Sequence, residues 1–405
     1  MSHGKTIIFL GDGMADEPVP ALGGRTPLQA ARKPAMDSIA RDGVCGTLLT
    51  LPVGYPTSSE VANMSVLGCD LATEYCGRGP LEAAGLNIPM GPDDTAFRVN
   101  LTTVRDGVLK DYSGGHVTQE HAIELIEALN RHFGGANVRF YPGVSYRNIL
   151  ILSGPEFSHR VRADKPDDNH GQSLSAHLPS AQTPEAETTA ALLRKIMQEA
   201  QSVLEPHPVN RRLAAAGRGM ANGVWPWSGG RASGFRTLNR KYGISGAVIT
   251  AVGVIAGLGR CLGMDVIPVK GATGYIDTDY EAKADAAIAA ARTHDFVFVH
   301  LEGIDEVSHL QDLALKIKAI EDFDARLIAR VLAAVGPDAT VAVLPDHPVP
   351  IATGRHTRTP VPVAVRKAGT EPDGVRTFDE IACREGRLGA MKDGDLMTLL
   401  FGRAL

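Results

Sequence analysis

The sequence predicts an α/β protein with a mainly parallel sheet, in which a smaller domain is inserted into a larger one. Short apolar runs recur along the chain and suit strands buried on both faces. Helical patterns separate these runs, as in folds where strands and helices alternate. The middle of the chain differs in composition, and 405 residues are about right for two domains.

Four runs predict central strands of the sheet. None of them alternates between apolar and polar residues, so both faces of each strand are expected to be covered. The runs are Thr6–Leu10, Ala247–Thr250, Phe296–Val299 and Thr340–Leu344.

Turn and cap residues mark the predicted helices between the strands. Thr26-Pro27 opens one helix and Gly43 follows another, while Thr183-Pro184 opens a third that runs towards Leu204. Proline is favoured in the first turn of a helix, where its missing N–H is not needed.

A further helix is predicted after Thr118 and ends at Gly134. The residues predicted to form its apolar stripe are Ile123, Ile126, Leu129 and Phe133.

The middle of the chain is predicted to be the inserted domain. Between about Gly77 and Arg240 the strand signals weaken and Gly, Pro and His are frequent. We therefore expect a discontinuous domain of residues 1–76 and 241–405, and a smaller α/β domain of residues 77–240 inserted into it. The polar stretch 162–184 is either a surface loop or one that covers a substrate.

Composition excludes several classes of function. The net charge of −5, without a basic block, argues against a nucleic-acid-binding role. No apolar run reaches membrane-spanning length, and the start of the chain does not resemble a signal peptide. Five cysteines without a CxxC pair are typical of reduced thiols, so we expect a cytoplasmic protein.

Carboxylates and imidazoles follow the predicted strands. In parallel α/β sheets, ligands bind outside the carboxyl ends of the strands, so these side chains are expected to meet at one edge. They are Asp12, Asp305, His309, Asp346, His347 and His356.

These six side chains offer only nitrogen and oxygen ligands, which suit Mn²⁺, Zn²⁺ or Mg²⁺. Six protein ligands are too many for one tetrahedral ion but enough for two ions, and two-metal sites bind phosphoryl groups. Each residue alone has a simpler interpretation, since an Asp after a strand is often a turn residue or a helix cap.

Ser58 and Ser59 stand where a helix is predicted to begin. A serine in this position is usually an N-cap, and the spacing does not decide whether one of them is a nucleophile. A hydroxyl next to a divalent metal loses its proton more easily, and a helix N-terminus attracts phosphate. One of the two is therefore a candidate phosphoryl acceptor.

Several segments resemble, in family order and over nearly the whole chain, the cofactor-independent phosphoglycerate mutases. The likeness is closest to the archaeal-type branch of that family, which belongs to the alkaline phosphatase superfamily. The segments include "GDGMAD", "SSEVANMSVLGCD", "GRGPLEAAGL", "HLEGIDEVSH" and "PDHPVPIATGRHTRTPVPV".

The resemblance implies an alkaline-phosphatase-like core and assigns roles to the candidate residues. It makes Ser59, rather than Ser58, the nucleophile. It also implies two divalent ions, with Mn²⁺ as the expected metal and Mg²⁺ or Zn²⁺ as alternatives. By resemblance one ion takes Asp12, Ser59, Asp346 and His347, and the other takes Asp305, His309 and His356.

The resemblance also implies that the inserted domain contributes substrate-binding side chains. His116 and Arg147 are the first candidates. Weaker candidates, for which a solvated surface charge is the simpler interpretation, are Asp164, His170, Arg231 and Lys283.

The resemblance implies a metal-dependent mutase that interconverts 3-phosphoglycerate and 2-phosphoglycerate through a phosphoserine. A homoserine kinase-like enzyme or another phosphotransferase is the alternative, because Trp225 and Trp227 occupy a segment where archaeal relatives carry an Arg-Gly pair. A non-catalytic metal-binding or phosphate-binding protein is a third hypothesis, disfavoured by the intact serine. The expected partner is a small phosphorylated substrate, without nucleic acid or membrane, and the choice between monomer and homo-oligomer stays open.

Overall fold

The computed structural model describes residues 5–232, 234–392 and 394–402. The chain divides into two compact units, which we call the core unit (Met1–Tyr75 with Gly234–Leu405) and the inserted unit (Cys76–Ser233). The sequence analysis placed the boundaries of the inserted domain after residues 76 and 240.

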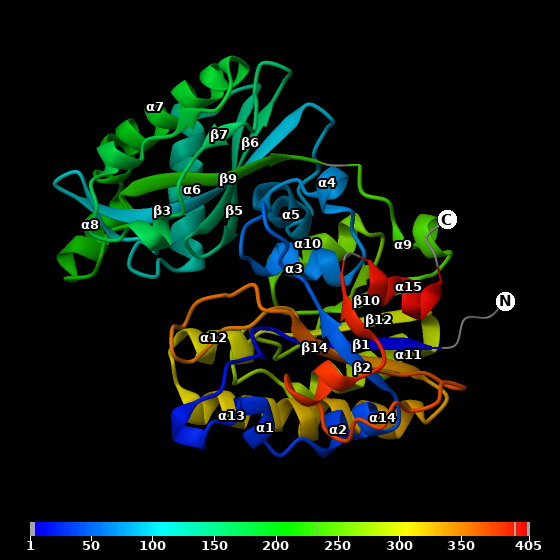
Figure 1. Ribbon diagram of the computed structural model, residues 1–405. Coiled ribbons are helices and arrows are strands. Elements are labelled where there is room, and N and C mark those ends of the chain that lie inside the picture. Colours follow the sequence, from blue (N-terminus) through cyan, green and yellow to red (C-terminus); the bar gives the residue numbers. More distant parts are fainter. Residues whose placement is uncertain (1–4, 233, 393, 403–405) are drawn as a thin grey trace. The chain divides into compact units, whose positions relative to one another are not determined.

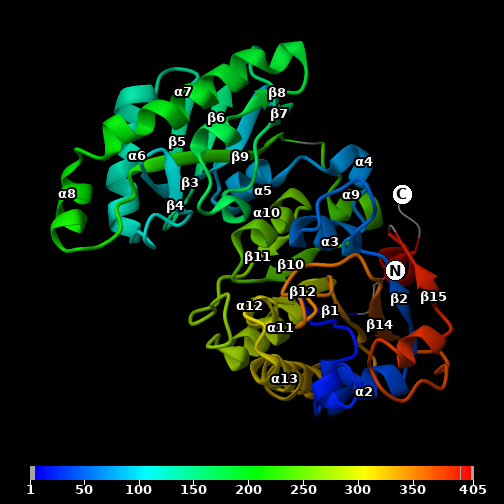
Figure 2. The same ribbon diagram turned by 60° about the vertical axis from the view of Figure 1, so that its left-hand side comes forward.

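The core unit is built on a sheet of eight strands, and its central strands are parallel. In spatial order the strands are β11 (Asp265–Val266), β10 (Gly246–Ile249), β12 (Phe296–Leu301), β1 (Thr6–Gly11), β13 (Thr340–Pro345), β14 (Val361–Arg366), β2 (Val44–Leu48) and β15 (Gly389–Met391). β14 runs antiparallel to β13 and to β2. Figure 2 shows β10, β12, β1 and β14 in this order. The predicted α/β class with a mainly parallel sheet is confirmed.

All four predicted central strands are present, and every residue of β1, β10, β12 and β13 is buried. This burial explains why their sequences are apolar without alternation, since helices cover both faces of such strands.

Helices of the core unit flank the sheet. They are α1 (Pro27–Ala30), α2 (Pro34–Arg41), α3 (Ser59–Val66), α4 (Leu71–Glu74), α9 (Leu238–Tyr242), α10 (Gly253–Cys261), α11 (Tyr280–Thr293), α12 (Gly303–His309), α13 (Leu313–Asp322), α14 (Ala329–Val335) and α15 (Asp395–Phe401). A π-helical segment, Phe323–Ile328, joins α13 to α14. Figure 1 shows α13, α1, α2 and α14 along one face of the sheet.

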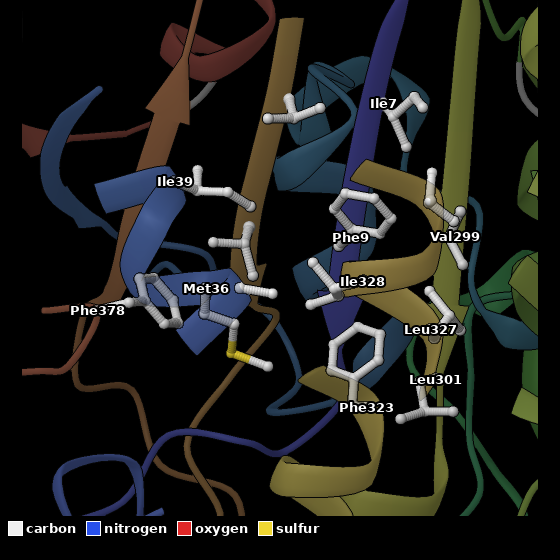
Figure 3. Packing of buried hydrophobic residues seen from close by; sticks show 14 of the residues in the cluster. Ile7, Phe9, Met36, Ile39, Val299, Leu301, Phe323, Leu327, Ile328 and Phe378 are labelled. Atoms are coloured by element: carbon white, nitrogen blue, oxygen red, sulfur yellow. The ribbon is translucent and has the colours of Figure 1, made fainter. Parts of the chain in front are cut away.

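The main apolar core lies between this helical face and the sheet. Phe9 of β1 and Val299 of β12 face Phe323 and Ile328 of the π-helical segment, and Met36 of α2 completes the layer (Figure 3). All five side chains are fully buried. Burying each such side chain contributes about 1.5–3 kcal/mol, so this layer fixes the strands whose ends carry the candidate site.

The inserted unit contains an antiparallel sheet, although its sequence gave weaker strand signals. The strands are β3 (Asp94–Arg105), β4 (Val108–Asp111), β5 (Val138–Val144), β6 (Arg147–Ser153) and β9 (Gly223–Arg231), with β7 (Val161–Arg162) and β8 (Ser180–Ala181) as a separate pair. β3 is the central strand and pairs with β4, β6 and β9. The helices are α5 (Arg78–Gly85), α6 (Gln119–Phe133), α7 (Glu187–Leu204) and α8 (Pro208–Ala215).

Helix α6 begins and ends as the sequence predicts, but one residue of its predicted stripe is wrong. The Thr118 hydroxyl caps the N-terminus by accepting from the His121 amide at 3.4 Å. Ile123 is 38% exposed, while Ala122 and Leu125 are buried. The buried face consists of Ala122, Leu125, Ile126, Ala128 and Leu129, so it includes two alanines that a pattern of large apolar residues does not pick out.

The polar stretch 162–184 contains no long element. Two short 3₁₀ turns, Pro166–Asn169 and Leu174–His177, lie between β7 and β8. The longest helix of the inserted unit, α7, has 18 residues. Within residues 5–232, 234–392 and 394–402, no helix combines the length and the apolar character that a bilayer-spanning segment requires.

Candidate active site

The carboxyl ends of three parallel strands bring the first candidate residues together. Asp12 follows β1 and Asp346 follows β13, and the register places Gly11 level with Pro345 and with Leu301 of β12. The ends of the three strands therefore form one edge, as the sequence predicted for these carboxylates.

Asp12, Asp346 and His347 form a compact buried group. Their ligand atoms lie within 4.8 Å of one another, and all three side chains are fully buried. The Nε2 atom of His347 lies 3.3 Å from Asp12 Oδ1 and 3.4 Å from Asp346 Oδ2. The backbone amides of Gly13 and His347 both donate to Asp346 Oδ1, at 3.1 and 2.8 Å, and fix that carboxylate.

A second group overlaps the first. Asp305, His347 and His356 again place their ligand atoms within 4.8 Å. His309 Nε2 lies 3.2 Å from Asp305 Oδ2, and His356 Nε2 lies 3.5 Å from Asp305 Oδ1. The rings of His347 and His356 stack with their centroids 3.8 Å apart. The structure thus brings together all six candidate carboxylates and imidazoles, and His347 takes part in both groups.

Ser59 is the hydroxyl that joins these groups. It is the first residue of α3, and its Oγ lies 3.2 Å from His347 Nε2. Ser58 occupies the N-cap position with extended backbone, but its side chain makes no cap hydrogen bond. Of the two serines, Ser59 is therefore the one whose hydroxyl contacts the candidate metal ligands.

Asn63 connects the Ser59 turn to the carboxylates, and sequence reasoning assigned it no role. Its amide nitrogen donates to the Ser59 carbonyl at 2.9 Å and to Asp346 Oδ2 at 3.0 Å. Residues four apart lie on one face of a helix, and this spacing could have pointed to Asn63.

Two cations hold the loops that carry the site. Arg358 donates to the carbonyls of Leu51, Pro52 and Tyr55, which precede α3. Lys316 is fully buried and donates to Asp16 Oδ2 at 2.8 Å and to the Val349 carbonyl at 2.9 Å.

Sequence reasoning also missed His300 and Glu302. Together with Asp12 they form a third group of ligand atoms within 4.8 Å. His300 Nε2 lies 3.1 Å from Asp12 Oδ2, and its Nδ1 lies 3.3 Å from the Thr250 hydroxyl. The signal was present, because both residues lie at the end of the predicted strand Phe296–Val299.

Burial sets the electrostatics of the site. It raises the pKa of Asp12 and of Asp346 well above the usual carboxylate range, and neighbouring carboxylates raise them further. Burial also lowers the pKa of His347 well below its usual value. Burial would raise the pKa of Asp305, but its hydrogen bond with His309 and the nearby imidazoles lower it to about 2. Buried carboxylates this close together need cations beside them if they are to ionise.

The substrate-binding candidates His116 and Arg147 lie in the inserted unit. His116 has a left-handed backbone with φ +50°, which is uncommon for a residue other than glycine. Its ring lies 6.3 Å from that of Tyr146, whose hydroxyl accepts from Arg147 Nη2 at 3.1 Å.

The remaining candidates have partners of their own. Asp164 pairs with His177 at 2.8 Å, His170 contacts the Lys110 carbonyl at 2.6 Å, and Arg231 donates to the Phe157 carbonyl at 2.6 Å. Lys283 lies in α11 of the core unit, where it is fully buried. It donates to the His300 carbonyl at 3.2 Å, so it lies beneath the third group of ligand atoms.

Comparisons with known proteins give a consistent picture. Residues 40–210 match the family model described as 2,3-bisphosphoglycerate-independent phosphoglycerate mutase. The enzyme of that name from Methanosarcina acetivorans is 45% identical over 400 residues, which is 98% of this chain and 99% of the relative. A probable enzyme of the same name from Geobacter sulfurreducens is 43% identical over 98% of this chain and all of the relative.

Solved structures agree with the sequence relatives. A protein from Pyrococcus horikoshii matches with a TM-score of 0.84 and 27% identity, over 99% of this chain and 97% of that one. The cofactor-independent phosphoglycerate mutase from Thermoplasma acidophilum matches with a TM-score of 0.68 and 29% identity, over 98% of each chain.

Proposed function

Since this chain belongs to the 2,3-bisphosphoglycerate-independent phosphoglycerate mutases, we propose that it interconverts 3-phosphoglycerate and 2-phosphoglycerate with Ser59 as the phosphoryl acceptor. The observation that carries the role of Ser59 is its position. Its Oγ stands at the first residue of α3 and 3.2 Å from His347, which belongs to both groups of metal-ligand atoms.

The residues present fit divalent metal ions. Asp12 Oδ1, Asp305 Oδ1 and His347 Nδ1 are buried and make no hydrogen bond within the described ranges, and oxygen and imidazole donors suit Mn²⁺, Mg²⁺ and Zn²⁺. We propose that two divalent ions bind here and that Mn²⁺ is the preferred metal. Their ligands would be Asp12, Ser59, Asp346, His347, Asp305, His309 and His356. Bound there, they would neutralise the phosphoryl oxygens and lower the pKa of the serine hydroxyl.

The protein's own groups prepare Ser59 for attack on phosphorus. The first amides of α3 point out of the helix N-terminus and favour an anion there. Asn63 holds the Ser59 carbonyl and Asp346 in one arrangement, which sets the direction of the Oγ. In the first transfer, from substrate to enzyme, the Ser59 Oγ–P bond forms as the substrate O–P bond breaks. The proton lost by Ser59 passes to the departing substrate oxygen.

The reverse transfer then completes the isomerisation. Glycerate stays bound while its other hydroxyl turns towards phosphoserine 59. The bond from that oxygen to phosphorus forms as the Ser59 Oγ–P bond breaks, and the hydroxyl proton returns to Ser59 Oγ. Water must be excluded during this interval, because a phosphoserine at this site would otherwise hydrolyse. We propose that side chains of the inserted unit hold the glycerate, with His116 and Arg147 as first candidates.

An assay of the purified, Mn²⁺-loaded protein tests the function. Conversion of 3-phosphoglycerate should proceed without 2,3-bisphosphoglycerate, and brief acid quenching should trap phosphate on Ser59. ATP-dependent phosphorylation of homoserine is the comparison reaction. Homoserine phosphorylation in the absence of mutase activity would overturn the proposal, and phosphate trapped on Ser58 would overturn the assignment of the acceptor.

A further inference from the structure

Three neighbouring strands of the core sheet each place a polar side chain at or just beyond the carboxyl end. The strands β10, β12 and β1 lie side by side in that order (Figure 2). The register sets His300 of β12 level with Leu10 of β1, two residues before Asp12, and Thr250 directly follows β10. Thr250, His300 and Asp12 therefore form a row across the edge of the sheet that carries the candidate metal site.

Hydrogen bonds connect this row from one end to the other. His300 Nε2 lies 3.1 Å from Asp12 Oδ2, and His300 Nδ1 lies 3.3 Å from Thr250 Oγ1. The amide of Val252 donates to the same threonine hydroxyl at 3.0 Å. The Asp12 amide donates to the carbonyl of Leu301 at 2.9 Å, so the backbone also keeps Asp12 beside the imidazole. Both ring nitrogens of the fully buried His300 thus have a polar partner.

The partners of His300 determine which of its nitrogens carries a proton. An ionised carboxylate can only accept hydrogen bonds, so Nε2 donates to Asp12. Thr250 Oγ1 already accepts from Val252, which leaves its own proton for Nδ1. Imidazole binds a metal through an unprotonated nitrogen, and neither nitrogen of His300 is free to do so. His300 therefore holds a metal ligand and does not itself act as one, although it lies within the third group of ligand atoms.

The charged groups around His300 also disfavour a cation in the third group. Lys283 is fully buried and donates to the His300 carbonyl at 3.2 Å. An ammonium group this close repels another cation in a buried place. Glu302 Oε2 lies 4.0 Å from His300 Nε2, farther than Asp12 Oδ2, so Asp12 is the partner of that nitrogen.

The two oxygens of Asp12 consequently have different surroundings. Oδ2 accepts from His300, whereas Oδ1 is buried and makes no hydrogen bond within the described ranges. Oδ1 faces the first group of ligand atoms, 3.3 Å from His347 Nε2. The imidazole thus occupies one oxygen and leaves the other for a metal ion.

We propose that Thr250 and His300 are positioning residues that direct Asp12 Oδ1 towards the ion held by Asp12, Asp346 and His347. The inference deepens the proposed function and rests on it, because that ion is the one expected beside Ser59. Metal-bound carboxylates are commonly held by hydrogen bonds from residues behind them, and these bonds set the direction of the ligand atom.

Calorimetric titration of the full chain with Mn²⁺ tests the pair. His300→Leu removes the donor to Asp12 and should weaken Mn²⁺ binding about tenfold to hundredfold, the usual cost of losing the partner of a metal ligand. Thr250→Val keeps the shape of the side chain but not its hydroxyl, and should weaken binding roughly twofold to tenfold, the net worth of one hydrogen bond. Thr250→Val changes no charged group, so it keeps the test decisive if His300→Leu fails to fold.

His294→Leu is the matched control. His294 Nε2 lies 3.0 Å from Asp265 Oδ2, so this variant also removes a contact between an imidazole and a carboxylate. His294 precedes β12, at the opposite edge of the sheet from the candidate site. Its replacement should leave the Mn²⁺ affinity unchanged.

His300→Gln distinguishes a positioning residue from a ligand. A glutamine amide nitrogen can donate to Asp12 but offers a metal no lone pair, so this variant should recover most of the Mn²⁺ affinity that His300→Leu loses. Loss of a bound ion in His300→Gln would overturn the proposal in favour of direct ligation by His300.

The remaining outcomes separate this inference from the proposed function. Wild-type Mn²⁺ affinity in either of the folded variants His300→Leu and Thr250→Val would overturn the positioning role, even in an active mutase. A wild-type protein that lacks mutase activity but shows the expected order of Mn²⁺ affinities would overturn only the proposed function.

Discussion

Adding one methyl group at Gly13 should distort the candidate metal site, because the structure leaves no space for it. Gly13 has φ +63°, and a Cβ there would lie 2.6 Å from Asp305 Oδ1 and 2.8 Å from Asp305 Cα. Its amide also donates to Asp346 Oδ1. Gly13→Ala therefore strains the backbone and displaces residues of both metal-ligand groups.

Two contributions set how much Gly13→Ala lowers the free energy of unfolding. A left-handed backbone costs a residue with a Cβ about 1–2 kcal/mol. Forcing extra atoms into a packed interior costs about 1–3 kcal/mol more. Gly13→Ala should lower the free energy of unfolding by the sum, roughly 2–5 kcal/mol. Gly23→Ala isolates the first term, since Gly23 has φ +68° and nothing within 4 Å of the added atom.

Urea unfolding of the two variants, with Mn²⁺ and with chelator, measures the difference. Gly13→Ala should also hold less Mn²⁺ and show strongly reduced mutase activity, while Gly23→Ala keeps wild-type values of both. Equal unfolding free energies for the two variants, or full Mn²⁺ binding by Gly13→Ala, would refute the argument that contact with Asp305 dominates.

The remaining predictions concern the nucleophile, its supports and the buried cations. Ser59→Ala should abolish mutase turnover with unchanged circular dichroism, whereas Ser58→Ala should retain most activity; equal losses would contradict the assignment of Ser59. Asn63→Ala should lower kcat more than it raises KM, because it frees the Ser59 turn from the carboxylates, and steady-state kinetics on the metal-saturated variant measure this split. Chelation should remove activity, and Mn²⁺ should restore it, as metal analysis and assay on the same sample can check. Burial lowers the pKa of Lys283 to about 8, so between pH 8 and 10 the unfolded chain binds more protons and stability should rise with pH; Lys283→Met should flatten this slope in urea unfolding at graded pH.

The six carboxylates and imidazoles could be predicted from the sequence because they come after predicted parallel strands. Each of Asp12, Asp346 and His347 follows a run of apolar residues, and adjacent parallel strands must end at the same edge. That argument needs no knowledge of side-chain packing. It does not assign ligands to individual ions, and His347 contacts both groups.

Other residues depend on packing that one sequence does not reveal. Asn63 looks like an ordinary helical residue until α3 lies against Asp346. Arg98 looks like an ordinary charge in a strand, and only the pairing of β3 with β9 shows that it lies opposite Trp227. The strands of the inserted unit gave weak signals because polar residues such as Arg98, Asn100 and Asn148 lie buried within them.

The order in which the chain is synthesised does not match the order of strands in the core sheet. β1 begins at Thr6, but its partners on either side begin at Phe296 and Thr340. At about 5–20 residues per second, a ribosome needs roughly 15–60 s to make the first of these partners. The inserted unit, Cys76–Ser233, is continuous and has its own apolar core, so it can fold during that interval. The nascent N-terminal strand stays unpaired meanwhile, with its apolar side chains available to chaperones.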